Sequence, residues 1–247
     1  MSTFALVHGA WQTAATWDLV APGLRAGGHA VTIPLLSGLE GESSISPAVS
    51  LSQHIDDVLE ALTRTDAAEV VLVGHSYAGM IITGVAEQAA SRIKRLVYID
   101  AFVPADGQSV MDLLPPTIAE MFREQARRLG GGWLLPSGEG QLDLWGLKPG
   151  PERDFVRARL SDFSLRCFEE KLRLHSDCAA KLPRTFIASV AEGYPARAVF
   201  QRFADRARNE GWSYHELPTG HDSHVERPEA VASILMTGES AVPASAV

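Results

Sequence analysis

The sequence has few cysteines, fewer basic than acidic residues, and no long apolar run. Only Cys167 and Cys178 occur among 247 residues, too few for a disulfide framework, and they have no zinc-type spacing. Lys and Arg number 22 against 30 Asp and Glu, so the net charge is −8, which argues against a surface for nucleic acid or anionic membranes. The opening MSTFALVHGAW is neither a secretory leader nor a membrane span. We therefore expect a soluble, cytoplasmic protein with no nucleic-acid or membrane partner.

Short apolar runs rich in β-branched residues alternate with segments of helical period. The runs cover residues 3–8, 29–34, 69–74, 95–100, 184–189 and 212–217. In residues 50–64, Ile55, Val58 and Leu62 share one helix face, and His54 falls off that stripe, which predicts a solvated histidine. Residues 77–90 are apolar nearly all round and predict a buried helix. The alternation predicts an α/β fold with a mainly parallel six-stranded sheet and helices on both faces.

Residues 104–182 interrupt this rhythm with six prolines and two helix-like stretches, 117–129 and 151–174. An insertion between two strands of an open α/β sheet usually lies over the carboxyl edge, where such folds keep their sites. We therefore predict a core of residues 1–103 and 183–237 and a helical cap of residues 104–182 after the fourth strand. The last residues, 238–247, have no periodicity and predict a disordered tail.

The stretch VVLVGHSYAGM, residues 70–80, combines a buried strand, a turn with a central serine, and an apolar helix. This order is typical of the strand-to-helix elbow that presents a nucleophilic Ser76. Gly74 fits the motif, whereas Ala78 stands where its second glycine is usual. The alternative is a serine that only caps a buried helix.

A serine hydroxyl needs a base to take its proton. His221 lies in a Gly-His-Asp loop directly after the last predicted strand, which is the place of the histidine in the order serine, acid, histidine. His224, three residues later, is interpreted instead as a surface residue that leads into the terminal helix.

Four segments together resemble the α/β-hydrolase superfamily: residues 3–34 with their HGAW loop, GHSYAGM, VYIDAFVP and TGHD. The resemblance is to the small branch of plant methylesterases and hydroxynitrile lyases with their bacterial esterase relatives, and it runs to about residue 236. It implies a Ser-His-acid triad, no cofactor and no metal. It assigns Ser76 as nucleophile and His221 as base, with an oxyanion hole formed by the backbone N–H groups of Ala10 and Tyr77.

Two carboxylates compete for the third position of the triad. In this family the acid usually stands in the loop after the strand that precedes the last one, which corresponds to Glu192 in TFIASVAE, and Glu can replace Asp in that role. Asp100, at the end of RLVYID, would lie at the same edge of the sheet. We predict Glu192 and keep Asp100 as the alternative. Asp222 adjoins His221 and is expected to point away from Nδ1.

The residues around the triad favour ester hydrolysis over the other reactions of the family. Its lyases have an acid before the nucleophile and a lysine after the histidine, whereas His75 and Asp222 occupy those positions here. We expect a serine esterase that cleaves small, neutral, hydrophobic or aromatic esters through an acyl-enzyme. A hydroxynitrile lyase or a non-catalytic small-ligand receptor on the same fold is the alternative. The oligomeric state stays open, a homodimer included.

Overall fold

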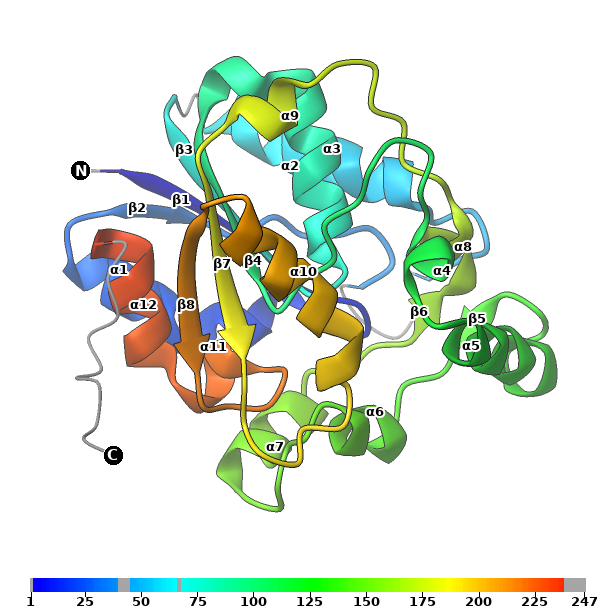
Figure 1. Ribbon diagram of the computed structural model, residues 1–247. Helices are drawn as coiled ribbons and strands as arrows, with labels where there is room; N and C mark the ends of the chain where they lie inside the picture. The colour runs from blue at the N-terminus through cyan, green and yellow to red at the C-terminus, as the bar shows by residue number, and fades with distance from the viewer. Residues whose placement is uncertain (1, 40–44, 66–67, 238–247) are drawn as a thin grey trace.

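The computed structural model describes residues 2–39, 45–65 and 68–237, and its centre is one six-stranded sheet (Figure 1). The strands lie in the order β2-β1-β3-β4-β7-β8, and every neighbouring pair is parallel. Their bounds are β1 Thr3–Val7, β2 Ala30–Thr32, β3 Val70–His75, β4 Ile93–Ile99, β7 Arg184–Ser189 and β8 Ser213–Leu217. The predicted six-stranded parallel sheet is confirmed.

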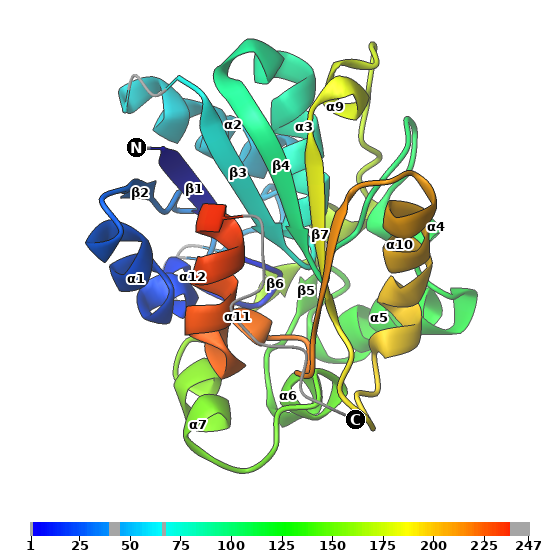
Figure 2. The same ribbon diagram turned by 60° about the vertical axis from the view of Figure 1, so that its left-hand side comes forward.

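Helices cover both faces of the sheet because its strands are apolar on both sides (Figure 2). In β1, Phe4 and Leu6 belong to one core, whereas Ala5 and Val7 belong to the other. The 3₁₀-helix η1 (Ala14–Leu19), α1 (Ala21–Ala26) and α12 (Pro228–Thr237) cover the first face. The second is covered by α2 (Leu51–Arg64), α3 (Ala78–Ala89) and α10 (Arg197–Asn209). Two short elements complete the layers, η2 (Ala90–Arg92) and α11 (Ser223–Glu226).

His54 on α2 is buried, in contrast to the solvated histidine that its position predicted. Its Nδ1 lies 3.1 Å from the hydroxyl of Tyr77, and its Nε2 lies 2.9 Å from the carbonyl oxygen of Ser37. The apolar stripe of the helix predicted exposure wrongly, because two polar partners inside the fold satisfy both ring nitrogens of His54.

The chain between β4 and β7 forms the helical insertion, most of which lies beyond the carboxyl ends of the strands (Figures 1 and 2). Its elements are α4 Val110–Leu113, α5 Pro116–Leu129, β5 Leu134–Leu135, α6 Glu139–Leu144, α7 Pro151–Arg157, β6 Phe163–Ser164, α8 Leu165–Glu169 and α9 Cys178–Lys181. The helix predicted over 151–174 is therefore interrupted, because residues 163–164 pair antiparallel with β5. The predicted tail, 238–247, lies outside the described residues.

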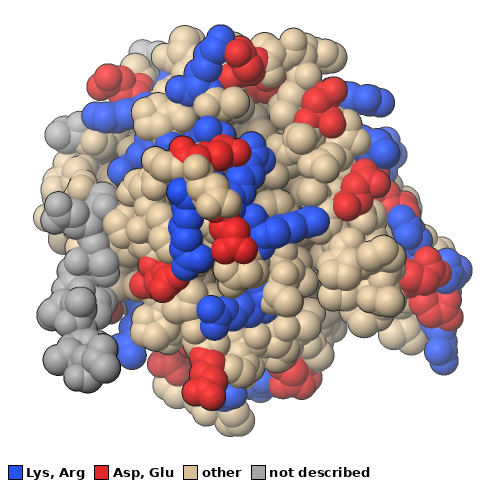
Figure 3. Space-filling view, viewed as in Figure 1, with Lys and Arg blue, Asp and Glu red and all other residues tan. Residues whose placement is uncertain are grey.

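Charges of both signs are mixed on the face shown in Figure 3, where Lys and Arg lie among Asp and Glu. Ion pairs within one helix include those of Arg127 with Glu120 and Glu124 on α5. Within the described ranges, no helix combines the length and the apolar character needed to cross a bilayer.

The close approach of α3 to the sheet depends on two glycines. A Cβ at Gly74 would lie 2.8 Å from the carbonyl oxygen of Ala78, and one at Gly79 would lie only 1.9 Å from that of Phe102. Ala78, in contrast, keeps its methyl group in the buried core. The alanine in the motif is thus accommodated, and the strict requirement for glycine falls one residue later.

We predict that Gly79→Ala lowers the free energy of unfolding by roughly 1–3 kcal/mol, because the new methyl group must displace backbone. Gly140→Ala is the matched control: it is also a helical glycine, but its Cβ would meet no atom within 4 Å, so it should be neutral or slightly stabilising. Urea unfolding followed by circular dichroism measures both. Equal effects of the two substitutions would contradict this account.

Candidate active site

Ser76 occupies the turn between β3 and α3 and has a left-handed backbone with φ 56°. Its N–H donates to the carbonyl oxygen of Ile99 at 3.1 Å, and its own carbonyl accepts from Gly79 and Phe102, both at 3.1 Å. A non-glycine residue in this region is strained and persists only where its surroundings hold it. The three hydrogen bonds provide that support, and the geometry is that of a nucleophile elbow.

Asp100 follows the neighbouring strand β4 and is also left-handed, with φ 41°. Its N–H donates to Ile187 at 2.8 Å, which ties it to β7. Its Oδ2 lies 2.7 Å from Nδ1 of His221, and both side chains are buried. Asp100 therefore stands where a triad acid orients its histidine.

Glu192 does not reach His221, which corrects the prediction that Glu192 is the carboxylate beside this histidine. The Glu192 side chain is exposed, on the loop after β7. In this loop the N–H of Ala191 still donates to the carbonyl oxygen of Thr219, just beyond the end of β8. Gly193 then turns the chain with φ 75°, and the residue that enters the interior is Tyr194. Of the two carboxylates that the sequence offered, the structure brings Asp100 to the histidine.

Tyr194 is a site residue that the sequence analysis missed. Its hydroxyl donates to Oδ2 of Asp100 at 2.7 Å and lies 3.0 Å from Nδ1 of His221. The tyrosine hydroxyl, the carboxylate oxygen and the imidazole nitrogen thus form a buried triangle in which each atom contacts the other two. No motif marks this tyrosine, and only its two-residue distance from Glu192 connects it with the loop that was singled out.

Burial controls the protonation of this pair. It lowers the pKa of His221 to about 3 and raises the pKa of Asp100 to about 8, because both charged forms lose hydration. Hydrogen bonds from Tyr194 and the Ser189 N–H oppose the shift of the Asp100 pKa by stabilising the carboxylate. Burial thus favours the neutral imidazole, which is the form that can accept a proton from a serine.

The loop after β1 lies directly against the elbow. A Cβ at Gly9 would be 3.0 Å from Cβ of Ser76 and 3.0 Å from Nδ1 of His75. Within the described residues, neither the Ala10 N–H nor the Tyr77 N–H donates a hydrogen bond. Two backbone donors without a partner beside the serine suit an oxyanion hole.

A small apolar cavity of about 60 Å³ contains Ser76 and His221 in its wall. Its other lining residues are aromatic or aliphatic and come mainly from the insertion and α10: Phe102, Phe122, Trp145, Phe168, Val199 and Phe200 among them. Such a chamber excludes water from the serine and accommodates uncharged groups.

Beneath the site lies a buried cluster of His75, Asp222 and His224, whose ligand atoms lie within 4.8 Å of one another. These are residue types that zinc accepts. Two of them, however, already have partners: Nε2 of His75 donates to the His221 carbonyl at 3.0 Å, and Asp222 accepts from Gln12, in the loop after β1, at 2.5 Å. The carboxylate at Nδ1 of His221 is that of Asp100, whereas Asp222 binds Gln12. His224 is fully buried rather than on the surface.

Comparison with known proteins identifies the family. The family model "Alpha/beta hydrolase family" matches residues 4–234. A carbendazim hydrolyzing esterase from Nocardioides sp. (strain SG-4G) is 35% identical over 246 residues, 95% of this chain and 98% of its own. Methylesterase 2 from Arabidopsis thaliana is 32% identical over 165 residues, 65% of this chain and 60% of its own. Among solved structures, an extracellular alpha/beta-hydrolase from a Paenibacillus species has a TM-score of 0.80 and 25% identity over 98% of this chain and 100% of its own.

The chain belongs to the alpha/beta hydrolase family. The esterases among its relatives place it in the class of ester-cleaving serine hydrolases with this fold.

Proposed function

We propose that the chain cleaves carboxylic esters through an acyl-enzyme formed on Ser76. His221 takes the serine proton and returns it to the leaving alcohol, and Asp100 holds the imidazole in the required tautomer. The N–H groups of Ala10 and Tyr77 stabilise the negative charge that develops on the carbonyl oxygen. Water then attacks the acyl group, assisted by the same base, and regenerates the enzyme.

One observation carries this proposal: the strained Ser76 lines a single cavity together with His221, whose Nδ1 contacts Asp100. A serine that only capped α3 would need neither the left-handed turn nor a histidine in the same cavity wall. Two unpaired backbone donors beside the serine support the same reading.

The lining of the cavity supports small, neutral, hydrophobic or aromatic esters as substrates. The Nocardioides relative is a carbendazim hydrolyzing esterase, and carbendazim therefore belongs among the substrates to be tested. Residues 104–182 are the cap in this proposal, since they supply much of that lining. We also propose a cytoplasmic location, because Cys167 and Cys178 are both free thiols.

The lyase alternative gains no support from the position after the histidine. Asp222 is buried there and accepts a hydrogen bond from Gln12. An acidic side chain in this place offers no positive charge to hold cyanide, whereas an ester hydrolase needs none.

We predict that Ser76→Ala lowers kcat for a short-chain aryl ester by about 10⁴-fold or more, because the nucleophile is lost. A fluorophosphonate probe should label the native protein and not the variant, as detected by mass spectrometry. A native protein that resists the probe would instead be a non-catalytic receptor, and a variant that keeps its esterase activity would refute the assignment of Ser76.

The choice of acid is tested by two matched amides. Asp100→Asn should lower kcat by about 10⁴-fold, since an amide favours the wrong imidazole tautomer. Glu192→Gln should leave kcat within about twofold, as expected for an exposed surface change. Steady-state kinetics on one aryl ester compares them. The opposite ranking would restore Glu192 as the acid.

We predict that Tyr194→Phe moves the acidic limb of the kcat/KM profile to higher pH. Loss of the phenol removes a hydrogen bond to the Asp100 carboxylate, so the Asp100–His221 pair takes up its proton at higher pH. A hydrogen bond to a charged group corresponds to a shift of about one to two pH units. Tyr214→Phe is the matched control, because it also removes a phenol–carboxylate hydrogen bond, to Glu216, but away from the site. Identical profiles for Tyr194→Phe and the native enzyme would contradict the role of Tyr194.

A further inference from the structure

A second and larger hollow lies in the insertion, between α5 and the segment that contains α6. Its volume is about 510 Å³, within the range of small-molecule sites. From α5 it is lined by Met121, Gln125 and Leu129, and from α6 by Gly140 and Gln141. We call it the outer pocket and the cavity at Ser76 the inner cavity.

Two large apolar side chains of the outer pocket are open to solvent. Met121 is 50% exposed and Leu129 is 69% exposed. Exposed apolar side chains that gather in a concave site mark a surface that binds something apolar. None of the residues that line the outer pocket has an ionisable side chain, so its ligand is an uncharged group.

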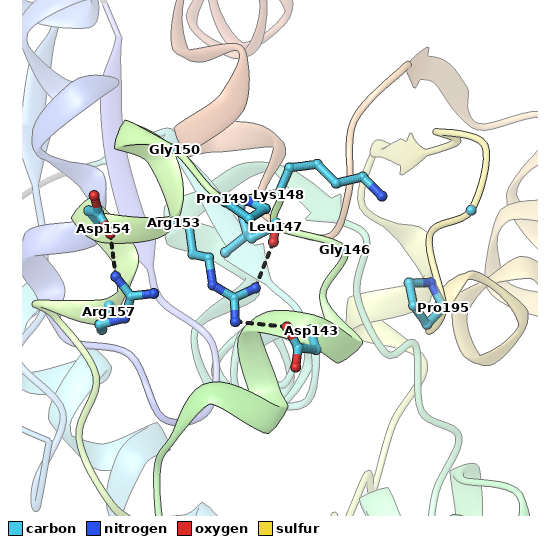
Figure 4. Close-up of a pocket in the computed structure, with 11 residues that line it drawn as sticks. Asp143, Gly146, Leu147, Lys148, Pro149, Gly150, Arg153, Asp154, Arg157 and Pro195 are labelled. Carbon is cyan, nitrogen blue, oxygen red and sulfur yellow. Dashed lines mark hydrogen bonds and ion pairs between the residues drawn. The ribbon is translucent and has the colours of Figure 1, made fainter.

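A neighbouring hollow between α7 and the loop of residues 193–195 differs in this respect (Figure 4). Its arginines are already neutralised by the protein: Arg153 binds Asp143 at 2.7 Å, and Arg157 pairs with Asp154. Lys148 also lines this hollow, so its lining is charged. The outer pocket has an uncharged lining and shares four residues with the inner cavity, which makes it the stronger candidate for a site that binds part of an ester.

The outer pocket and the inner cavity share one wall. Trp11, Phe122, Leu144 and Trp145 line both. The inner cavity, at about 60 Å³, has room for only a few heavy atoms, since one water needs on the order of 10–15 Å³. An ester with a bulky group cannot fit entirely inside it, and the adjoining space across this wall is the outer pocket.

We infer that the outer pocket binds the bulky, uncharged aromatic half of the ester, while the inner cavity holds the carbonyl and the smaller half. The inference rests on the proposed function and defines its substrate class: esters that join one flat apolar group to one small group. The shared wall of indole and phenyl rings packs well against an arene. The four lining residues that the outer pocket shares with the inner cavity at Ser76 favour a substrate over a protein partner as the occupant.

Gly140→Phe is the variant that tests this inference. A Cβ at Gly140 would meet no atom within 4 Å, so the side chain enters without strain and fills space at the pocket. Ala180→Phe adds the same ring to an exposed position on α9, away from both cavities, and serves as the control. The substrates are 2-naphthyl acetate and methyl 2-naphthoate, which carry the arene on opposite sides of the ester, and ethyl acetate as the small reference.

We expect Gly140→Phe to lower the ratio of kcat/KM for at least one naphthyl ester to that for ethyl acetate by about tenfold, through a higher KM. Ala180→Phe should leave that ratio unchanged. The naphthyl ester that responds identifies the half that occupies the outer pocket. An unchanged ratio for both naphthyl esters overturns the inference, and so does a fall that Ala180→Phe reproduces.

A binding measurement separates this result from a failure of the proposed function. In a Ser76→Ala background, calorimetry with methyl 2-naphthoate and with 2-naphthyl acetate should show binding, and Gly140→Phe should weaken the binding of at least one of the two by about tenfold. Such binding supports the pocket even if hydrolysis proves independent of Ser76. Equal binding of both naphthyl esters with and without Gly140→Phe overturns the inference while leaving the catalytic assignment intact.

Discussion

Two neighbouring parallel strands, each followed by a left-handed residue, hold the reactive groups together. Ser76 follows β3 and Asp100 follows β4, and the register pairs His75 with Ile99 just before them. Hydrogen bonding fixes the spacing between adjacent strands of a sheet at just under about 5 Å. The nucleophile and the proposed acid thus keep their separation through the most rigid part of the core, and His221 has to be brought to a pair that is already fixed.

His221 is held by contacts from several parts of the chain. Its Nδ1 meets Asp100, its N–H donates to Trp145 in the insertion at 2.8 Å, and its carbonyl accepts from His75. The next residue, Asp222, is bound by Gln12 from the loop after β1. The core, the insertion and the loop after β1 therefore all constrain the position of His221, so a displacement of any of them alters the placement of this histidine.

Local patterns predicted the sheet and the main helices and selected Ser76 and His221 as candidates, because each depends on a short stretch of sequence. The choice between the two candidate carboxylates could not be made from such local patterns. Glu192 and Asp100 both end up at the correct edge, and what separates them is the turn at Gly193, which exposes one carboxylate and brings in Tyr194. Burial of His54 and His224 escaped prediction for a related reason, since their neighbours are distant in sequence. The same holds for the two cavities, which form where separate segments meet.

The position of Asp100 also changes what the loop after β7 has to preserve. When the acid stands in that loop, every insertion, deletion or substitution there is constrained by the need to reach the histidine. In the proposed mechanism the acid is Asp100 at the end of β4, and the exposed Glu192 is released from that constraint. The loop is then free to diverge between relatives at Glu192, whereas a change at Asp100 or Tyr194 alters the buried triangle around His221. In the proposed mechanism, replacement of Glu192 by a residue without a carboxylate therefore leaves the triad intact.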